Sequence, residues 1–447
     1  MPRTQAPERH RLRRPLPRAL QPFTVRRYRI LALALTLSLL GTGIWIVALV
    51  WQVIAIDGGP VELSQVATGS AVGMLVAVLF GGVLADRVPQ DRILLGVEAT
   101  KSILVGALAV LSLTGTLRLW HLVVVAVVVG ATEGFFYPAY SALLPNVLPT
   151  EQLLAANGVE GVLRPAVMQA AGPAVAGAAI AALSPGLALA LVAGSQVLAA
   201  VGLSRLRITL PPREQSDGHP VAGLFADLRE GYLYMVRTPW FLATLLFATG
   251  WVLLLIGPIE VLLPFAVRDQ TGGGAGAFAL VLASFGVGGA LGSLLVASWR
   301  LPRRYLTVMV MLWGAGAMPV AVIGLTDRLA VMVAAVFVVG LTSGAATVIW
   351  GTLLQRRVPA ALLGRVSSLD FFVSILLMPV SMALAGPVGE AFGLGPVFLV
   401  AGLVPVLFAV AAVILARMPR DELEHPLDHH VPEATTGGAD ETAGTAG

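Results

Sequence analysis

The chain has 447 residues, of which 57% are hydrophobic and only 12% are charged, and its mean hydropathy is +0.86. Soluble domains carry about 25% charged residues, so this composition excludes an ordinary multi-domain soluble enzyme and any disordered or fibrous class. The absence of cysteine excludes disulfides, thiolate metal sites and a cysteine nucleophile. The one lysine, Lys101, follows Thr100, which excludes the Gly-Lys pair of a phosphate-binding P-loop.

Long apolar stretches follow one another along the whole chain. About 20 apolar residues in a helix cross the hydrocarbon core of a bilayer, and twelve stretches of this kind are bounded by charges and Gly/Pro turns. At Ser184-Pro185-Gly186 one continuous apolar run has to be divided into two helices. The predicted spans are 30–56, 62–85, 93–114, 119–141, 160–183, 186–205, 240–265, 275–299, 305–325, 329–353, 366–390 and 395–416. The sequence therefore predicts an all-α membrane protein with twelve transmembrane helices.

The segments outside the spans have distinct compositions. The longest break carries apolar residues at steps of three and four (Leu224, Leu228, Tyr232, Met235), which predicts an amphipathic helix on the cytoplasmic membrane surface. The polar, acidic C-terminal segment is expected to be disordered. The predicted organisation is a basic N-terminal tail (1–29), a six-helix bundle (30–205), a linker with the amphipathic helix (206–239), a second six-helix bundle (240–417) and a disordered tail (418–447).

Basic residues are distributed unevenly between the two sides of the membrane. With the N-terminus in the cytoplasm, 24 of the 29 Lys and Arg residues fall in cytoplasmic segments, and Arg118, Arg268 and Arg328 fall outside. This distribution satisfies the positive-inside rule, and an even number of spans returns the C-terminus to the cytoplasm. We expect a multi-pass protein of the plasma membrane with both termini in the cytoplasm.

The two halves of the chain share short motifs. Leu143-Leu144 recurs 210 residues later as Leu353-Leu354, and at the same offset Glu160 matches Asp370. A parallel repeat of six spans is found in transporters whose two halves are related by an axis along the membrane normal. We therefore expect two pseudo-symmetric six-helix bundles.

The loop after the second span carries the most specific motif. It reads Gly81-Gly82-Val83-Leu84-Ala85-Asp86-Arg87 and resembles the Gly-x-Leu-Ala-Asp-Arg signature of the major facilitator superfamily of transporters. The resemblance implies that Asp86 accepts hydrogen bonds from the first turn of the eleventh span, near Gly364-Arg365-Val366-Ser367, and holds the cytoplasmic side closed. The predicted gate residues are Gly82, Asp86, Arg87, Arg92, Arg365 and Asp370.

Further motifs narrow the resemblance to bacterial drug and siderophore exporters. Gly134 to Ala139, Leu354 to Pro359 and a weakened Gly172-Pro173 antiporter motif are similar to theirs. In contrast, Pro89-Gln90-Asp91 replaces the expected Gly-Arg-Lys, Thr42 stands where relatives often carry an acid, and the fourth span has no arginine. The proton-coupling residues therefore have to be predicted from this chain alone.

Two acidic residues within spans are candidates for proton coupling. An ionisable residue in a span costs about 2.5–3.5 kcal/mol on insertion scales, so each needs a partner or a function. Glu133, beside Gly130 and Gly134, is predicted to carry the proton, the alternative being a glutamate that only fixes helix packing. Glu260 follows the Gly257-Pro258 break and is either an outer gate or proton port or an interfacial residue in contact with water.

Other charges in the spans are expected to form pairs. Glu98 and Lys101, three residues apart in the third span, are predicted to satisfy each other, the alternative being a role in transport. Glu160 and Arg164, at the start of the fifth span, are predicted either to stabilise a helix end or to take part in the cytoplasmic gate. The same two interpretations apply to Asp370 at the matching start of the eleventh span.

The family fold implies that the first, fourth, seventh and tenth spans line a central cavity. Aromatic and hydroxyl groups around a carboxylate favour a large amphipathic or cationic ligand. No Arg or Lys occurs in these four spans, which disfavours an anionic substrate. The substrate-contact candidates, for which packing is the alternative role, are Thr42, Trp45, Gln52, Phe136, Tyr137, Trp251, Thr347 and Trp350.

Together these features predict a secondary transporter that exports lipophilic or cationic small molecules such as drugs, coupled to proton entry, by alternating access. One alternative is a dedicated exporter of one metabolite or siderophore, or an uptake facilitator of the same fold. Another is a transport-inactive membrane receptor or scaffold. An enzyme is not expected, because the sequence has no Ser/His/Asp cluster, HExxH helix or phosphate-binding loop. The predicted partners are the substrate, protons and the lipid bilayer, with no cofactor, metal or nucleic acid, and the predicted functional unit is a monomer.

Overall fold

The computed structural model describes residues 18–206, 220–299, 301–359 and 362–427, with the side chains of 18–19, 79–87, 150, 154 and 220–228 excepted. Every secondary-structure element in this part of the chain is a helix. Twelve helical segments are long and apolar enough to cross a membrane, as predicted. The protein is therefore a multi-pass membrane protein of the all-α class.

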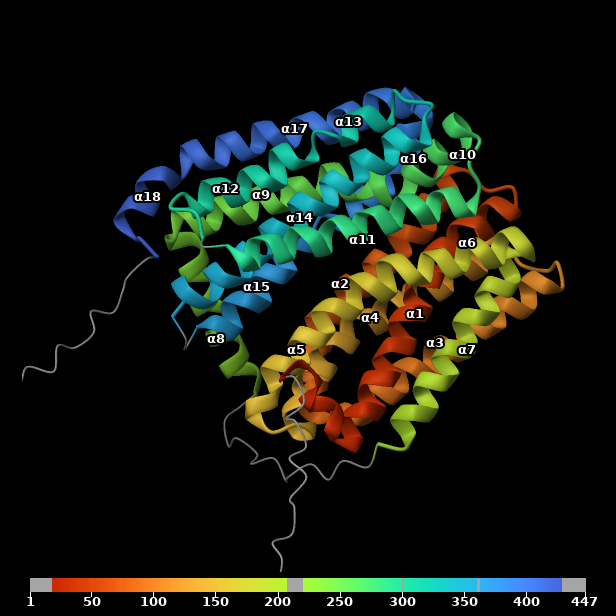
Figure 1. The fold of residues 1–447 in the computed structure, drawn as a ribbon, viewed down its shortest axis with the longest axis horizontal. Coiled ribbons are helices and arrows are strands. Elements are labelled where there is room, and N and C mark those ends of the chain that lie inside the picture. The colour runs from red at the N-terminus through yellow and green to blue at the C-terminus, as the bar shows by residue number, and fades with distance from the viewer. Residues whose placement is uncertain (1–17, 207–219, 300, 360–361, 428–447) are drawn as a thin grey trace, which may run out of the picture.

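The first half of the chain forms one bundle (Figure 1), in which α2 packs on α4 and α7 packs on α1 and α3. The predicted division of the long apolar run is confirmed, because α7 begins at Pro185 and the Ser184 hydroxyl accepts a hydrogen bond of 3.3 Å from the Leu187 N–H. The elements are η1 (Arg18–Thr24), α1 (Arg26–Ala55), α2 (Pro60–Arg87), α3 (Gln90–Leu113), α4 (Leu119–Val147), α5 (Thr150–Leu163), η2 (Arg164–Ala171), α6 (Gly172–Ala182) and α7 (Pro185–Ser204).

The second half forms a similar bundle, in which α11 packs on α14 and α17 packs on α9, α12 and α13. The elements are α8 (Pro220–Arg237), α9 (Pro239–Gly257), η3 (Pro258–Leu262), α10 (Leu263–Thr271), α11 (Ala275–Ser298), α12 (Tyr305–Gly314), η4 (Ala315–Ala317), α13 (Val320–Ile323), α14 (Leu329–Arg357), α15 (Leu363–Ile375), α16 (Met378–Phe392), α17 (Leu394–Leu415) and α18 (Met418–Glu424).

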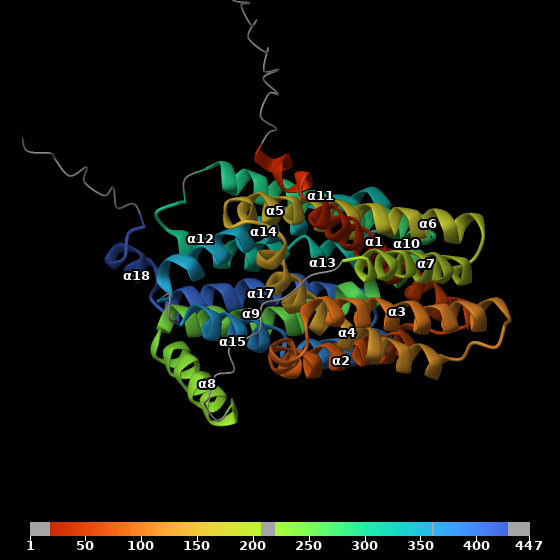
Figure 2. The ribbon, with the colours of Figure 1, turned by 90° about the horizontal axis from the view of Figure 1, so that it is seen from below.

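The bundles are joined most closely on one side of the molecule. We call the end where α1 begins and α17 ends the terminal side, and the other end the opposite side (Figures 1 and 2). On the opposite side a single hydrophobic core contains residues of both bundles. Toward the terminal side, each bundle has a separate core of its own. The two halves are therefore sealed together on the opposite side.

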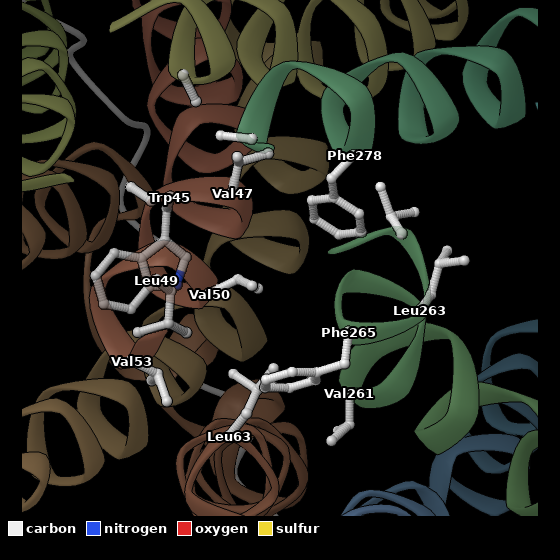
Figure 3. Close-up of a cluster of buried hydrophobic side chains, with 14 of the residues drawn as sticks. Trp45, Val47, Leu49, Val50, Val53, Leu63, Val261, Leu263, Phe265 and Phe278 are labelled. Carbon is white, nitrogen blue, oxygen red and sulfur yellow. The ribbon is translucent and has the colours of Figure 1, made fainter. Parts of the chain in front are cut away.

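The shared core is drawn in Figure 3, where Trp45, Val50 and Leu63 of the first bundle lie across from Phe265 and Phe278 of the second. The ring of Phe278 also stacks on Trp51 with 5.6 Å between centroids. Burial of aromatic and aliphatic side chains between the bundles stabilises this contact through the hydrophobic effect.

Helices α2 and α16 reinforce the seal through their backbones. The Gly386 N–H donates a buried hydrogen bond of 2.7 Å to the Ser64 hydroxyl. A Cβ atom at Gly386 would lie 2.3 Å from the Pro60 carbonyl oxygen, so only glycine allows this approach. The contact is thus specified by residues from opposite halves of the sequence.

The C-terminal segment corrects one prediction. Disorder was expected from residue 418 onward, but Met418–Glu424 form helix α18. Met418 is fully buried, and Glu422 accepts a 2.7 Å hydrogen bond from the Thr307 N–H at the start of α12. Asp421 also forms an ion pair with Arg357. These contacts order a short polar helix whose composition alone favours disorder. Residues 1–17 and 428–447, also parts of the predicted tails, lie outside the described residues.

Helix α8 occupies part of the predicted linker. Glu230 forms an ion pair with Arg365 of α15, and the Tyr234 hydroxyl donates a 3.2 Å hydrogen bond to the Arg357 carbonyl oxygen. Met235 is buried in the core of the second bundle. Helix α8 is therefore attached to the second bundle.

Candidate functional site

Two helices of the central region change their hydrogen-bonding pattern within the membrane span. In η2 and η3 the backbone bonds run from residue i to i+5, as in the bonds that end at Val167 and Pro258. Each stretch lies beside prolines, which lack the N–H that continues an α-helix. Such π-helical stretches often occur at functional sites because they reorient side chains. They place Arg164 and Glu260 at irregular points of their helices.

Close backbone packing fixes the position of α1 against η2 and α6. A Cβ at Gly43 would lie 2.4 Å from the Met168 carbonyl oxygen, and one at Gly172 would lie 2.6 Å from the Gly43 Cα. The two glycines therefore allow direct backbone contact. The close contact between α1 and the η2–α6 segment therefore requires glycine at both positions.

The centre of the first bundle holds an ion pair between two helices. Lys101 of α3 pairs with Glu133 of α4, and the Thr42 hydroxyl of α1 donates a 3.3 Å hydrogen bond to the same Glu133 oxygen. Glu133 is the fifteenth of the 29 residues of α4, so it lies about 21 Å from either helix end. The pair therefore lies near the middle of a helix that is long enough to cross the membrane.

The two charges differ in their access to water. The Lys101 side chain is 3% exposed, whereas Glu133 is 36% exposed. Charged groups at mid-membrane face the bundle interior or a water-filled cavity rather than lipid. We therefore expect the accessible part of Glu133 to face the bundle interior or a water-filled cavity rather than lipid, while the Lys101 side chain is buried.

The predicted pair of Glu98 with Lys101 is wrong, because the ion pair of Lys101 is with Glu133. Glu98 is fully buried and instead accepts a 2.6 Å hydrogen bond from the Ser38 hydroxyl of α1. Spacing of three residues puts Glu98 and Lys101 on one helix face but does not decide which other helices supply partners. The second Glu98 oxygen, Oε2, is buried and has no hydrogen-bond partner.

A small cavity adjoins the ion pair. Its volume is about 10 Å³, room for about one water molecule. The buried Gln196 Oε1, which has no hydrogen-bond partner, belongs to a lining residue. The lining residues are Thr42, Trp45, Lys101, Val105, Val129, Glu133, Val192 and Gln196. Three predicted residues, Thr42, Trp45 and Glu133, thus come together with Lys101 in one place.

The aromatic residues of α4 extend the site toward the terminal side. The Lys101 ammonium lies 5.7 Å from the centroid of the Phe136 ring. Tyr137, one turn along α4 from Glu133, lies near a second cation. Arg164, which pairs with Glu160 at 3.0 Å, lies 5.3 Å from the centroid of the Tyr137 ring. Cations over aromatic faces at these distances attract the rings electrostatically. Both predicted aromatics of α4 therefore contact a cation of this chain.

The second bundle holds a different polar contact. The Trp350 indole N–H donates a 3.0 Å hydrogen bond to Asp370 of α15, and the Trp350 ring stacks on Phe241 with 5.5 Å between centroids. Asp370, a predicted gate residue, and Trp350, a predicted substrate-cavity residue, are therefore in contact. Thr347 is exposed, and its hydroxyl donates to the Ser343 carbonyl oxygen at 2.8 Å.

Other predicted residues lie apart from these contacts. Gln52 is buried and accepts a 2.7 Å hydrogen bond from Ser112, while the Trp251 indole donates to the Trp313 carbonyl oxygen at 3.1 Å. Both therefore tie helices within one bundle. Glu260 is exposed on η3.

The predicted gate is described only in part. The side chains of Gly82, Asp86 and Arg87 lie outside the described residues, although α15 does contact α2. Arg92 is exposed at the start of α3. Arg365, at the start of α15, forms its ion pair with Glu230, a partner that the sequence analysis did not predict.

Sequence reasoning missed Gln196 and the hydrogen-bond partner of Ser38. Gln196 and Ser38 complete the central cluster. Each is an uncharged polar residue within an apolar run, and such residues frequently bond to their own helix backbone. The one available signal was Gly41, since a Cβ there would lie 2.6 Å from Gln196 Nε2. A glycine within an apolar helix indicates close packing, but it does not identify the residue that packs against it.

Comparisons with known proteins agree with this architecture. A family described as transmembrane secretion effectors matches residues 18–441. The multidrug efflux pump Tap of Mycolicibacterium fortuitum is 30% identical over 395 residues, which cover 85% of this chain and 93% of that protein. Macrolide efflux protein A of Streptococcus pyogenes is 23% identical, with coverage of 87% and 95%.

Solved structures share the fold at low sequence identity. A crystal structure of a variant of the nucleoside transporter NupG superposes with a TM-score of 0.68 at 9% identity, covering 88% of this chain and 99% of that one. At this identity the likeness concerns the fold alone. Because the family match spans nearly the whole chain and the Tap relative covers most of it, the chain belongs to the major facilitator superfamily of membrane transporters.

Proposed function

We propose that the protein exports lipophilic or cationic small molecules in exchange for protons, by alternating access between its two bundles. The similarity to proteins named as multidrug and macrolide efflux pumps supports the direction of transport and the breadth of the cargo. The two bundles within one chain support a monomer as the functional unit.

The observation that carries the proposal is the Lys101–Glu133 ion pair at mid-depth. A carboxylate that is 36% exposed in the middle of a membrane helix can bind a proton or a cationic ligand, but not both at once. Competition of this kind is the simplest way to link the movement of a cation to a proton. Trp45 and Phe136 next to the pair supply aromatic surface for a lipophilic cation.

Glu133 is thus the proposed coupling acid. In this conformation Glu133 pairs with Lys101, as expected of an ionised carboxylate that is ready to bind a cationic ligand. Glu260 is the second proposed coupling residue, because it is an exposed carboxyl in a π-helical stretch. In η3 it lies closer to the opposite side than Glu133 does, which suits a port where protons enter.

The direction of opening follows from the contacts between the bundles. The positive-inside rule favours a cytoplasmic terminal side, since 24 of the 29 basic residues are predicted to fall in cytoplasmic segments. With the shared core sealing the opposite side, the site would receive cargo from the cytoplasm. Closure on the cytoplasmic side would use the Asp86 loop and the start of α15, with Arg365 and Asp370.

Inside-out membrane vesicles test this function. Acidification of the vesicle lumen should drive uptake of a lipophilic cation such as tetraphenylphosphonium, and a protonophore should abolish the uptake. Glu133→Gln should lose uphill uptake, because the neutral amide cannot pair with a cation in exchange for a proton. Glu151→Gln, which changes an exposed carboxyl at the start of α5, is the matched control and should transport normally. Uphill uptake retained by Glu133→Gln would remove Glu133 from the coupling role.

A further inference from the structure

Glu98 is a buried acid that the proposed function has not used. Its side chain is fully buried at the centre of the first bundle, and its Oε2 has no hydrogen-bond partner. An ionised carboxylate without a partner is unfavourable in such a place, because burial removes the water that stabilises the charge. A protonated carboxyl carries no charge and does not meet this penalty.

The charges around Glu98 lead to the same conclusion. Ser38 of α1 donates a hydrogen bond to it, and Glu133 of α4 is near enough to repel its negative charge. Lys101 lies one turn further along α3, and α7, which also packs on α3, contains no charged residue. One ammonium and two carboxylates would give this group a net charge of −1. Because Lys101 already pairs with Glu133, one proton on Glu98 makes the group neutral.

We propose that Glu98 holds the exchangeable proton in this conformation and that Lys101 moves between the two carboxyls during transport. A cationic substrate that binds to Glu133 displaces Lys101, which then pairs with Glu98. The O–H bond of Glu98 breaks, its proton passes to water, and Lys101 remains an ammonium throughout. The inference rests on the proposed function, in which a cation that binds to Glu133 is exchanged for a proton.

The identity of the cation supports a moving partner. The chain has 29 Lys and Arg residues, and all of them except Lys101 are arginine. An ammonium is a compact point charge on a flexible stem, whereas a guanidinium binds carboxylates through a planar, two-pronged contact. A lysine can therefore exchange one carboxylate for another more readily. Lys101→Arg should bind substrate but transport slowly.

Infrared difference spectroscopy of the purified protein at neutral pH tests the proton on Glu98 without any substrate. The spectrum of the wild type minus that of Glu98→Gln should contain the C=O band of a protonated carboxyl. Ser38→Ala, which removes the hydroxyl donor to Glu98, should shift this band, and Glu151→Gln should leave it unchanged. A difference spectrum with only carboxylate bands would overturn the proposal.

Proton release on substrate binding tests the exchange itself. When tetraphenylphosphonium is added to weakly buffered protein with a pH indicator, the wild type should release one proton for each bound cation. Glu98→Gln should still bind the cation but release none. Equal release by Glu98→Gln would refute the exchange. Absence of cation binding and transport in the wild type would instead refute the proposed function, and the infrared band would still decide where the proton lies.

Discussion

Individual residues in this protein decide how closely helices approach and where charges are stabilised. Gly43 and Gly172 allow α1 to touch the irregular helix η2–α6, and this contact positions Thr42 beside Glu133. The small cavity and the ion pair then follow from side chains on four helices. The geometry of the site thus depends on two glycines, which have no functional group in their side chains.

Gly43→Ala tests this dependence. The new Cβ would lie 2.4 Å from the Met168 carbonyl oxygen, and because a backbone atom cannot move aside cheaply, we expect a loss of about 1–3 kcal/mol in stability. Thermal unfolding in detergent measures the change. Gly158→Ala is the control, since nothing lies within 4 Å of its added Cβ, and it should be neutral or slightly stabilising. Equal stability of the two variants would contradict the packing argument.

The candidate site could be predicted only in part at the residue scale. The cost of a charge in the membrane singled out Glu133, Glu98 and Lys101 from sequence alone. The partners were not predictable in the same way, because helical spacing relates residues within one helix, whereas Lys101 and Glu133 meet across two. The hydrogen bond from Ser38 to Glu98 left no signal in the sequence.

At the scale of elements, the features that were hardest to predict from the sequence occur at prolines and in short polar segments. The start of α7 could be predicted because Ser184 and Pro185 are strong helix-start residues. The prolines of η2 and η3 did not predict π-helices, because a proline indicates that an α-helix is interrupted but not which structure replaces it. Helix α18 was missed because its order comes from contacts with α12 and Arg357, not from its own composition.

The docking of α18 should depend on pH through Glu422. Burial raises the pKa of Glu422 above its ordinary value, although hydrogen bonds from Thr307 act in the opposite direction. The docked state therefore binds the proton more tightly than the free segment does. Docking should weaken as pH rises from the ordinary glutamate pKa through the raised one, and should level off above it.

Hydrogen exchange of residues 418–424 over this pH range measures the docking. Glu422→Gln keeps an oxygen that can accept from the Thr307 N–H but cannot ionise, so its protection, after correction for intrinsic exchange rates, should not vary through the window. Glu422→Ala should lose protection at every pH. A pH dependence in Glu422→Gln equal to that of the wild type would show that another group is responsible.

At the scale of the whole molecule, hydropathy and charge predicted the twelve helices and the class of fold. They could not predict which side is sealed, because the same sequence must favour both conformations of a transport cycle at small energy differences. The shared core around Trp45, Leu63 and Phe278 belongs to one of these conformations. The backbone contact at Gly386 would have to separate in the other.

The absence of cysteine in the natural sequence makes this motion directly measurable. Spin labels on Asn146→Cys and Gln355→Cys report on the terminal side, and labels on Asp57→Cys and Asp327→Cys report on the opposite side. All four residues are exposed and each pair joins the two bundles. Pulsed electron paramagnetic resonance then gives the distance within each pair in liposomes.

This measurement tests the central claim, that the two bundles alternate around the acidic cluster. Lowering the pH or adding tetraphenylphosphonium should shorten the distances in one pair and lengthen them in the other, with the terminal-side pair longest when the opposite side is sealed. Glu133→Gln should reduce the response to pH. Distances that stay constant in both pairs, or that change in the same direction in both, would contradict the account.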